Sequence, residues 1–218
     1  MSDSARATLR DGLAEAVTAG DRARAVDLAI GAIAGDAVTV TELHTILGDL
    51  LRSIGAGWRA GTTSVWQEHA ASAVVRTVIE ALHPLVRARA VAPNGRTVVL
   101  ACPEDEVHDL GLRMLSDRLE LVGWTVCYLG ADTPAGEIAS AALATGASLI
   151  VLSASTHFHV MRLRTTLEVL EADAPGVRVL VGGAATCGDG ASVAAGHLFD
   201  PAEFFPDDAG PAPACEGE

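Results

Sequence analysis

Three residues in one short stretch have the types and the spacing needed to bind a metal or a flat ligand. Glu106, His108 and Gly111 lie within six residues of one another. An imidazole is a common metal ligand, and a nearby carboxylate can accept the proton of its other ring nitrogen. Gly111 carries no side chain, so a large planar ligand can approach its backbone. Taken alone the pattern is weak, because a single loop histidine is more often a solvated or packing residue.

The elements around this stretch place it on a strand-to-helix loop. Residues 97–101 are apolar and rich in valine, which indicates a buried strand. Residues 109–122 have apolar side chains at helical spacing, at Leu112, Leu115 and Leu119. In an open α/β sheet ligands bind beyond the carboxyl ends of the strands, which is where this loop lies.

Two further apolar runs end in small residues at defined distances. Ser153 and Ser155 follow the run 149–152, and 41 residues separate Gly111 from Ser153. Gly182 and Gly183 follow the run 177–181, and 26 residues separate Ser155 from Gly182. From residue 96 onward we predict a doubly wound, flavodoxin- or Rossmann-like parallel sheet. Its strands are expected at 97–101, 125–129, 148–152 and 177–181, with a short fifth at 197–199, and its helices at 109–122, 134–145 and 159–173.

These motifs and spacings resemble the cobalamin-binding module of methionine synthase and its relatives. That module has D-x-H-x-x-G, then S-x-L, then G-G, and the resemblance covers residues 96 to 200. Here Glu106 replaces the aspartate and keeps the carboxylate, and Ser155 replaces the leucine. The resemblance implies that His108 binds the cobalt of cobalamin. It also implies a cofactor site that includes Glu106, His108, Asp109, Gly111, Leu129, Gly130, Ser153, Ser155, His157, His159, Gly182 and Gly183.

Residues 4–90 read as a four-helix bundle with short connections. We expect Ser4 to cap the first helix and Asp21 the second. We expect Thr39 or Thr41 to cap the third helix, and Thr63 or Ser64 the fourth. A second group of candidate functional residues lies where the third helix ends and the fourth begins. It consists of Trp58 and, at helical spacing on one face of the fourth helix, Val65, Glu68 and His69. By itself this group favours an interfacial tryptophan beside a capping acid and a solvated histidine.

Next to a cobalamin module, the pattern W-x9-E-H resembles the adenosylcobalamin-dependent light-sensing transcription regulators. In that family the motif covers the upper face of the corrin, so the resemblance implies this task for Trp58, Val65, Glu68 and His69. Many members carry a histidine directly after the tryptophan, where this chain has Arg59. His157 and His159 stand where methionine synthase has hydroxyl residues. His159 can either pair with Glu106 or simply begin the next helix.

Composition and charge narrow the range of functions. The 218 residues are 50% hydrophobic but only 4% aromatic, and the net charge is −13, which opposes direct binding to nucleic acid or anionic lipid. We find no signal peptide or membrane-spanning run and no paired cysteine spacing, and we expect a cytoplasmic protein with reduced thiols. The stretch before the bundle is too short for the regulators' DNA-binding domain, so we expect output through a protein partner or self-association. Residues 201–218 are expected to be a flexible tail.

Three hypotheses follow, and none makes the chain a self-contained enzyme. The first is a cobalamin photoreceptor that regulates transcription or signalling through a partner, driven by photolysis of the Co–C bond of adenosylcobalamin and movement of the helical cap. The second is a corrinoid carrier protein of a methyltransferase system. The third is a light-independent cobalamin sensor.

Overall fold

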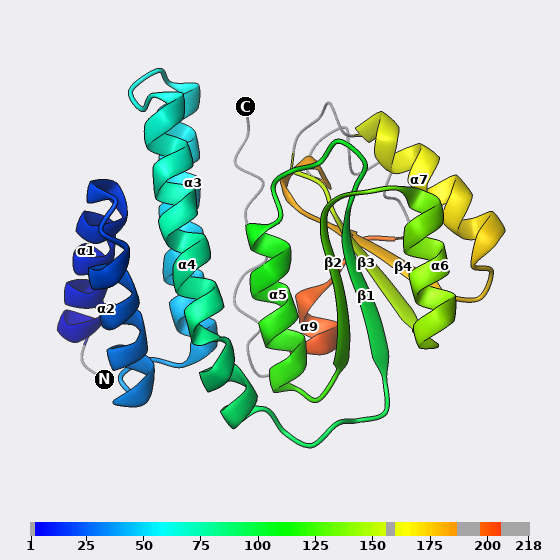
Figure 1. Ribbon diagram of the computed structural model, residues 1–218, viewed down its shortest axis with the longest axis horizontal. Coiled ribbons are helices and arrows are strands. Elements are labelled where there is room, and N and C mark those ends of the chain that lie inside the picture. Colours follow the sequence, from blue (N-terminus) through cyan, green and yellow to red (C-terminus); the bar gives the residue numbers. More distant parts are fainter. Residues whose placement is uncertain (1–2, 156–159, 187–196, 206–218) are drawn as a thin grey trace. The chain divides into compact units, whose positions relative to one another are not determined.

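The computed structural model describes residues 3–155, 160–186 and 197–205, and it divides the chain into two compact units. The N-terminal unit comprises residues 1–89 and the C-terminal unit residues 90–218. Figure 1 shows the first as helices alone and the second as a sheet with helices on both faces. Within the described residues, no helix combines the length and the apolar character that crossing a bilayer requires.

The N-terminal unit contains helices α1 (Asp3–Ala19), α2 (Arg22–Ala34), α3 (Val40–Arg59) and α4 (Val65–Arg89). Asp21 caps α2 by accepting a hydrogen bond from the Arg24 amide at 3.0 Å. Thr39, rather than Thr41, caps α3 in a reciprocal capping box with Glu42. The first helix begins at Asp3, so Ser4 lies inside its first turn instead of capping it.

Helix α4 is the centre of the N-terminal unit, because it packs against α1, α2 and α3. Its buried residues recur at helical spacing, which is the pattern of an amphipathic helix that turns one face to a core. Apart from His44, the buried residues of this unit are aliphatic, and they include Leu13, Val17, Ala25, Ala29, Ile33, Leu43, Leu47, Val74, Val75, Val78, Ile79, Leu82 and Val86. Helices α3 and α4 form a long hairpin whose connection is at 60–64 (Figure 1).

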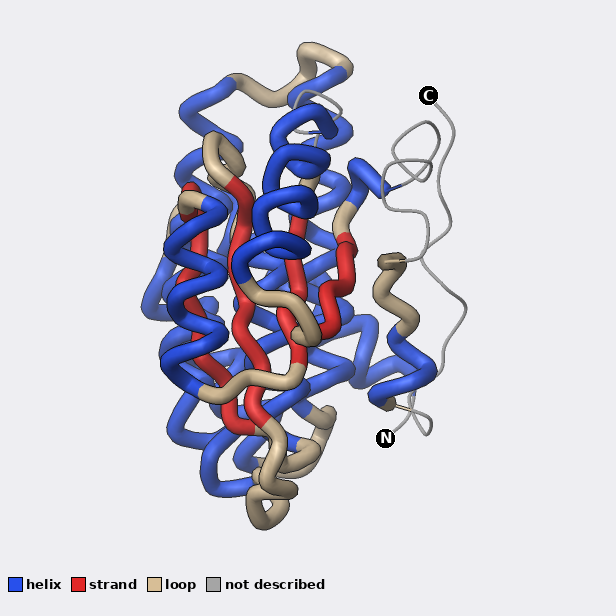
Figure 2. Tube along the Cα trace, turned by 90° about the vertical axis from the view of Figure 1, so that its right-hand side faces the viewer, coloured by secondary structure: helices blue, strands red, loops and turns tan. Residues whose placement is uncertain are grey.

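The C-terminal unit is a parallel four-stranded sheet in the order β2-β1-β3-β4, which confirms the doubly wound fold (Figure 2). Its elements in chain order are β1 (Thr97–Pro103), α5 (Leu110–Leu121), β2 (Thr125–Thr133), α6 (Ala135–Thr145), β3 (Leu149–Ser153), α7 (Val160–Asp173), β4 (Arg178–Gly182), the 3-10 turn η2 (Ala184–Thr186) and α9 (Pro201–Phe204). Strand β1 lies at the centre, so the loop that follows it emerges in the middle of the sheet edge.

Alternate residues of the central strands bury against opposite layers. Val99 and Ala101 pack with α6 and α7 on one face. Val98, Leu100 and Cys102 pack with α5 and the segment around Phe205 on the other. Figure 1 shows the same division, with α5 and α9 on one side of the sheet and α6 and α7 on the other. Because both faces are covered, the central strands β1 and β3 are buried along almost their whole length and do not alternate between apolar and polar residues.

The structure differs from the sequence prediction in the last described segment of the chain, residues 197–205. The expected fifth strand is a single bridge between Val181 and Leu198. Residues expected to begin a flexible tail instead form α9, capped by Asp200, and Phe205 is buried. The reason is aromatic packing, since the rings of Phe199 and Phe204 stack 5.0 Å apart and that of Phe204 lies 5.9 Å from Trp124.

Candidate functional site

The loop between β1 and α5 holds an imidazole on a buried carboxylate. The Nδ1 atom of His108 lies 2.7 Å from Oε1 of Glu106, and the same oxygen accepts the His108 amide at 2.8 Å. The other oxygen, Oε2, accepts the Ser155 amide at 2.6 Å. Glu106 is fully buried, whereas the side chain of His108 is 58% exposed. Because Nδ1 faces the carboxylate, Nε2 is the nitrogen that a metal would take.

Contacts on its outer side fix the same loop. The Asp105 amide donates to Oδ1 of Asp132 at 2.8 Å, and the Asp132 amide donates to the Glu106 carbonyl at 2.9 Å. Arg162 of α7 reaches over the loop and pairs with Asp105 at 2.9 Å and with Glu104 at 3.6 Å. Asp132 therefore holds the loop to β2.

Three polar side chains also support the loop: those of Cys102 and Asp109, which are buried, and that of Tyr128, which is half-buried. The Cys102 thiol donates to the His108 carbonyl at 3.8 Å, and the Tyr128 hydroxyl donates to Oδ2 of Asp109 at 3.0 Å. Burial, with the charges of Glu106 and Asp109, raises the pKa of Cys102 to about 12. Burial and Asp109 also raise the pKa of Tyr128. Both groups are therefore neutral at ordinary pH, and they support the loop without supplying a charge.

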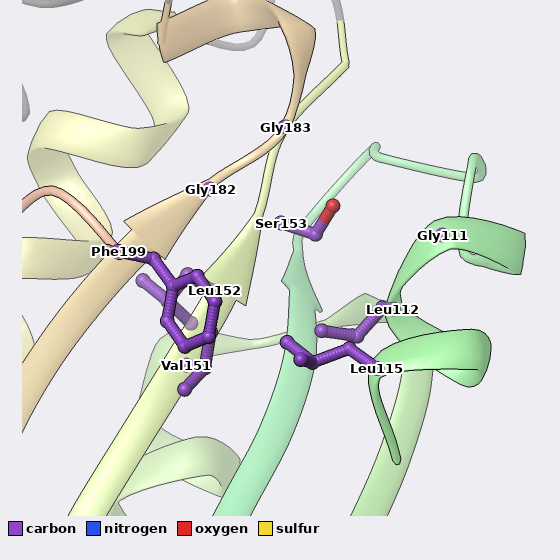
Figure 3. A pocket seen from close by; sticks show the side chains of 9 residues that line it. All are labelled: Gly111, Leu112, Leu115, Val151, Leu152, Ser153, Gly182, Gly183 and Phe199. Carbon is purple, nitrogen blue, oxygen red and sulfur yellow. The ribbon is translucent and has the colours of Figure 1, made fainter. Parts of the chain in front are cut away.

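A cavity of about 230 Å³ opens beside this loop, between the tips of β3 and β4 and the start of α5 (Figure 3). Its described lining residues are Gly111, Leu112, Leu115, Val151, Leu152, Ser153, Gly182, Gly183 and Phe199. It is the crevice at the carboxyl edge of the sheet in which ligands of this fold bind. The sequence pattern had singled out the three glycines and Ser153, and the structure brings all four to one cavity.

The glycines at the site meet different physical requirements. A Cβ on Gly111 would meet nothing within 4 Å, so this position is open to a ligand. A Cβ on Gly183 would lie 2.2 Å from the Ala154 carbonyl oxygen, and its φ of +101° disfavours any other residue. Gly183 is thus required by the protein backbone, whereas Gly111 leaves space that the protein itself does not use.

The end of the α3–α4 hairpin carries the second candidate group. Trp58 lies in the last turn of α3 and is 51% exposed, and Val65 begins α4 and is exposed too. Glu68 accepts a hydrogen bond from the Ser72 hydroxyl at 2.7 Å and pairs with Nε2 of His69 at 3.4 Å. Four of the sequence-predicted residues therefore lie on this one hairpin, with a large aromatic surface beside a carboxylate–imidazole pair.

The connection of this hairpin is tight. A Cβ on Gly57 would lie 2.5 Å from Oγ1 of Thr63, and the amides of Thr62 and Thr63 both donate to the Gly57 carbonyl, at 2.9 and 3.1 Å. The turn therefore folds back onto the end of α3 next to Trp58. Gly57 is a residue that the sequence reasoning missed, although a glycine immediately before the tryptophan was a signal for close packing.

Other predicted residues lie elsewhere or outside the described chain. Leu129 is not at a strand end, because β2 continues to Thr133, and its partly buried side chain packs against the core on the α6 face. Gly130 has a φ of +84° and lies against Tyr128 and Asp109. His157 and His159 fall outside the described residues. Phe199 lines the cavity and was missed, although three of the four phenylalanines cluster between residues 199 and 205.

Comparison with known families decides the class of ligand. Residues 96–200 match the family model described as the B12 binding domain, and residues 9–83 match a second model with the same description. The chain belongs to the B12-binding-domain proteins. One match falls in each unit of the structure, and the loop and cavity of the C-terminal unit lie within the match over residues 96–200.

Curated relatives of the chain include two transcriptional repressors and a corrinoid protein. The HTH-type transcriptional repressor CarH of Myxococcus xanthus is 33% identical over 82% of this chain, and the repressor CarA of the same organism is 33% identical over 57%. The chain spans 58% of CarH and 44% of CarA. A corrinoid protein of Desulfitobacterium hafniense is 23% identical over 82% of this chain and 85% of its own length.

A solved structure carries the same fold as this B12-binding protein. The monomethylamine corrinoid protein of Methanosarcina barkeri superposes with a TM-score of 0.73 at 21% identity, over 84% of this chain and 87% of its own. The site geometry also fits a corrinoid. An exposed imidazole is held on a buried carboxylate, and a mostly apolar cavity with an open glycine at its mouth lies beside it.

Proposed function

We propose that this B12-binding protein takes up adenosylcobalamin and acts as a light sensor that controls a protein partner. The observation that carries the proposal is the presence of two groups of candidate residues in one chain. One is the Glu106–His108 pair at the sheet edge, and the other is the exposed Trp58 with Glu68 and His69 on the α3–α4 hairpin. The 33% identity to CarH, a transcriptional repressor, supports a role in regulation.

On the lower side of the cofactor, His108 would bind cobalt through Nε2. Cobalt favours nitrogen donors of the imidazole type. Glu106 would hold the Nδ1 proton, which fixes the tautomer and makes Nε2 the basic atom. The cofactor's own nucleotide base would be displaced, and its nucleotide tail would enter the cavity beside Ser153 and Gly182.

Trp58, Val65, Glu68 and His69 are the residues that would hold the adenosyl group, Trp58 through its aromatic surface and the Glu68–His69 pair through its polar atoms. When bound, the cofactor supplies a Co–C bond that visible light breaks. The protein's task is to hold the adenosyl group in darkness and to change state when that group is lost. When the adenosyl group is lost, the aromatic surface of Trp58 loses the group that covered it. The hairpin would therefore have two states, one with the adenosyl group bound and one without it, and these states would differ in stability.

The output is proposed to pass through a protein partner or a second copy of the chain. The net charge of −13 disfavours direct contact between these two units and nucleic acid. A light-dependent change in the exposure of Trp58 provides an apolar patch whose availability differs between darkness and light.

The test is to reconstitute the full chain with adenosylcobalamin in darkness, and to record its absorption spectrum and elution volume before and after green light. A stable dark spectrum, followed by a spectral change together with a change in size or partner affinity, is the expected result. Trp58→Ala should bind cofactor yet lose the change in size. A spectral change without any change in size or association would exclude the sensor.

A corrinoid carrier of a methyltransferase system is the second candidate. It is favoured by the 23% identity to a corrinoid protein along 85% of that protein's length. A carrier would prefer methylcobalamin and would be demethylated by a partner methyltransferase, with the same result in darkness and light. The third reading, a light-independent cobalamin sensor, predicts a large response to cofactor addition alone.

A further inference from the structure

The cavity beside the His108 loop is apolar in its described lining. Leucine, valine and phenylalanine side chains form its walls, and Ser153 is the one described lining residue that has a hydroxyl group. The carbonyls of the glycine pair are already occupied by the chain itself. Gly182 accepts the Ala154 amide at 3.0 Å, and Gly183 accepts the Thr186 amide at 3.1 Å and its hydroxyl at 2.7 Å.

Phe199 is the aromatic residue among these lining groups, and the structure holds it by two contacts, one of its backbone and one of its ring. Its amide donates to the Val181 carbonyl at 2.8 Å, which ties the backbone to the edge of β4. Its ring stacks on Phe204 at 5.0 Å with an interplanar angle of 13°. Its Cβ lies where a side chain on Gly182 would make contact, 3.7 Å from the ideal Cβ of that glycine. Figure 3 shows the ring facing the cavity, across from Leu112 and Leu115.

The size of the cavity suits part of a ligand. Pockets that enclose a whole drug-sized molecule have volumes of about 300–1,000 Å³. At about 230 Å³, this cavity matches a flat bicyclic ring and not a corrin. In the function proposed above, the group that reaches it is the base at the end of the cofactor's nucleotide tail.

We propose that Phe199 is a specificity-determining residue for that base, and that it selects a benzimidazole over a purine. This inference rests on the proposed binding of cobalamin and adds the class of lower base that the protein accepts. A benzimidazole places apolar carbon against Phe199, Leu112 and Leu115. Adenine would bring an amine and further ring nitrogens into the same space, and each would lose water without a partner among these side chains.

The expected discrimination is moderate. An apolar pocket discriminates by roughly 10–200-fold in affinity between ligands that differ by one small group. Larger ratios require a polar group in the pocket that the wrong ligand leaves unpaired, and this pocket has no such group among its described lining side chains except Ser153. We expect cobalamin to bind about 10–100-fold more tightly than the corrinoid that differs only in carrying adenine as its lower base.

The experiment measures dissociation constants in darkness for three corrinoids with the same upper ligand: cobalamin, its adenine-base counterpart, and cobinamide, which lacks the nucleotide. Wild type is compared with Phe199→Ala and with Leu198→Ala, a control that removes an exposed apolar side chain from the neighbouring position. In Phe199→Ala the ratio between the two bases should fall to within about threefold, whereas Leu198→Ala should keep the wild-type ratio.

A second variant keeps the proposal testable if Phe199→Ala does not fold. Leu115→Asn places a hydrogen-bonding group on the opposite wall of the cavity and should improve binding of the adenine form relative to cobalamin. Equal affinity of wild type for the two bases, or a ratio that neither variant changes, would overturn the inference. In that case tight binding of all three corrinoids would leave the proposed function intact. Failure to bind any corrinoid would refute both.

Discussion

One carboxylate oxygen of Glu106 contacts His108 twice, at the ring nitrogen Nδ1 and at the backbone amide. The second oxygen holds the Ser155 amide, so Glu106 ties the loop after β1 to the loop after β3. The carboxylate therefore orients the imidazole and also fixes the backbone on both sides of the cavity mouth. Its complete burial means that no water competes for these bonds.

The first prediction concerns the metal ligand. In His108→Ala we expect weaker cobalamin binding, or a bound cofactor whose absorption spectrum reports a different lower ligand, because the imidazole that replaces the cofactor's base is gone. Titration of the purified chain with cofactor in darkness measures both. Added free imidazole should restore part of the wild-type spectrum. If affinity and spectrum equal those of wild type, His108 is not the ligand.

The second prediction concerns the partner of that ligand. Glu106→Gln removes the negative charge that holds the Nδ1 proton, and loss of such partners typically lowers metal affinity by about 10–100-fold. The cofactor dissociation constant should rise by that factor. Glu104→Gln is the matched control, since Glu104 lies in the same loop with an exposed side chain that pairs with Arg162. An equal effect of both variants would show that loop charge alone is responsible.

A third prediction separates the two kinds of glycine at the site. Gly111→Ala has open space and lies in the first turn of α5, so it should stabilise the cofactor-free chain by up to about 1 kcal/mol. It should nevertheless weaken cobalamin binding, because the methyl group occupies the ligand's space. Gly183→Ala should destabilise the cofactor-free chain by about 1–3 kcal/mol or more, because the backbone is left-handed and the Ala154 oxygen is in the way.

Urea unfolding and cofactor titration of both glycine variants give the measurement. The two variants are expected to move stability in opposite directions. Destabilisation by Gly111→Ala with unchanged affinity would contradict the assignment of Gly111 to the ligand's space.

The fourth prediction follows from the raised pKa of the Cys102 thiol, about 12 in the folded chain against 9.0 for an ordinary thiol. Between these pH values the unfolded thiol loses its proton and the folded one keeps it. The free energy of unfolding should therefore be unaffected by this group below about pH 9 and should fall above it, by up to about 1.4 kcal/mol per pH unit. Urea unfolding at pH 8 and pH 10 measures the slope. Cys102→Ala should show a smaller decrease than wild type.

The fold was largely predictable from local patterns. Valine-rich runs flanked by helical spacing predicted the strands and helices of the C-terminal unit, and Thr39 and Asp21 cap helices where the sequence placed them. Residues 201–205, the part of the expected tail that the structure describes, were not predictable in this way. The tail's composition of proline, aspartate and glycine suggested a flexible tail, but Phe204 and Phe205 pack against α5 and β2 across long sequence separations.

The sequence by itself determined which residues can do chemistry, because residue type and spacing place Glu106, His108 and the glycines at strand ends. Only the tertiary structure decided what each of them does. Strand register brings Ser155 to Glu106, and the fold directs Asp132 to the Asp105 amide and Leu129 into the core. It also places Phe199 in the cavity. These contacts join segments far apart in the chain, and local periodicity carries no information about such pairs.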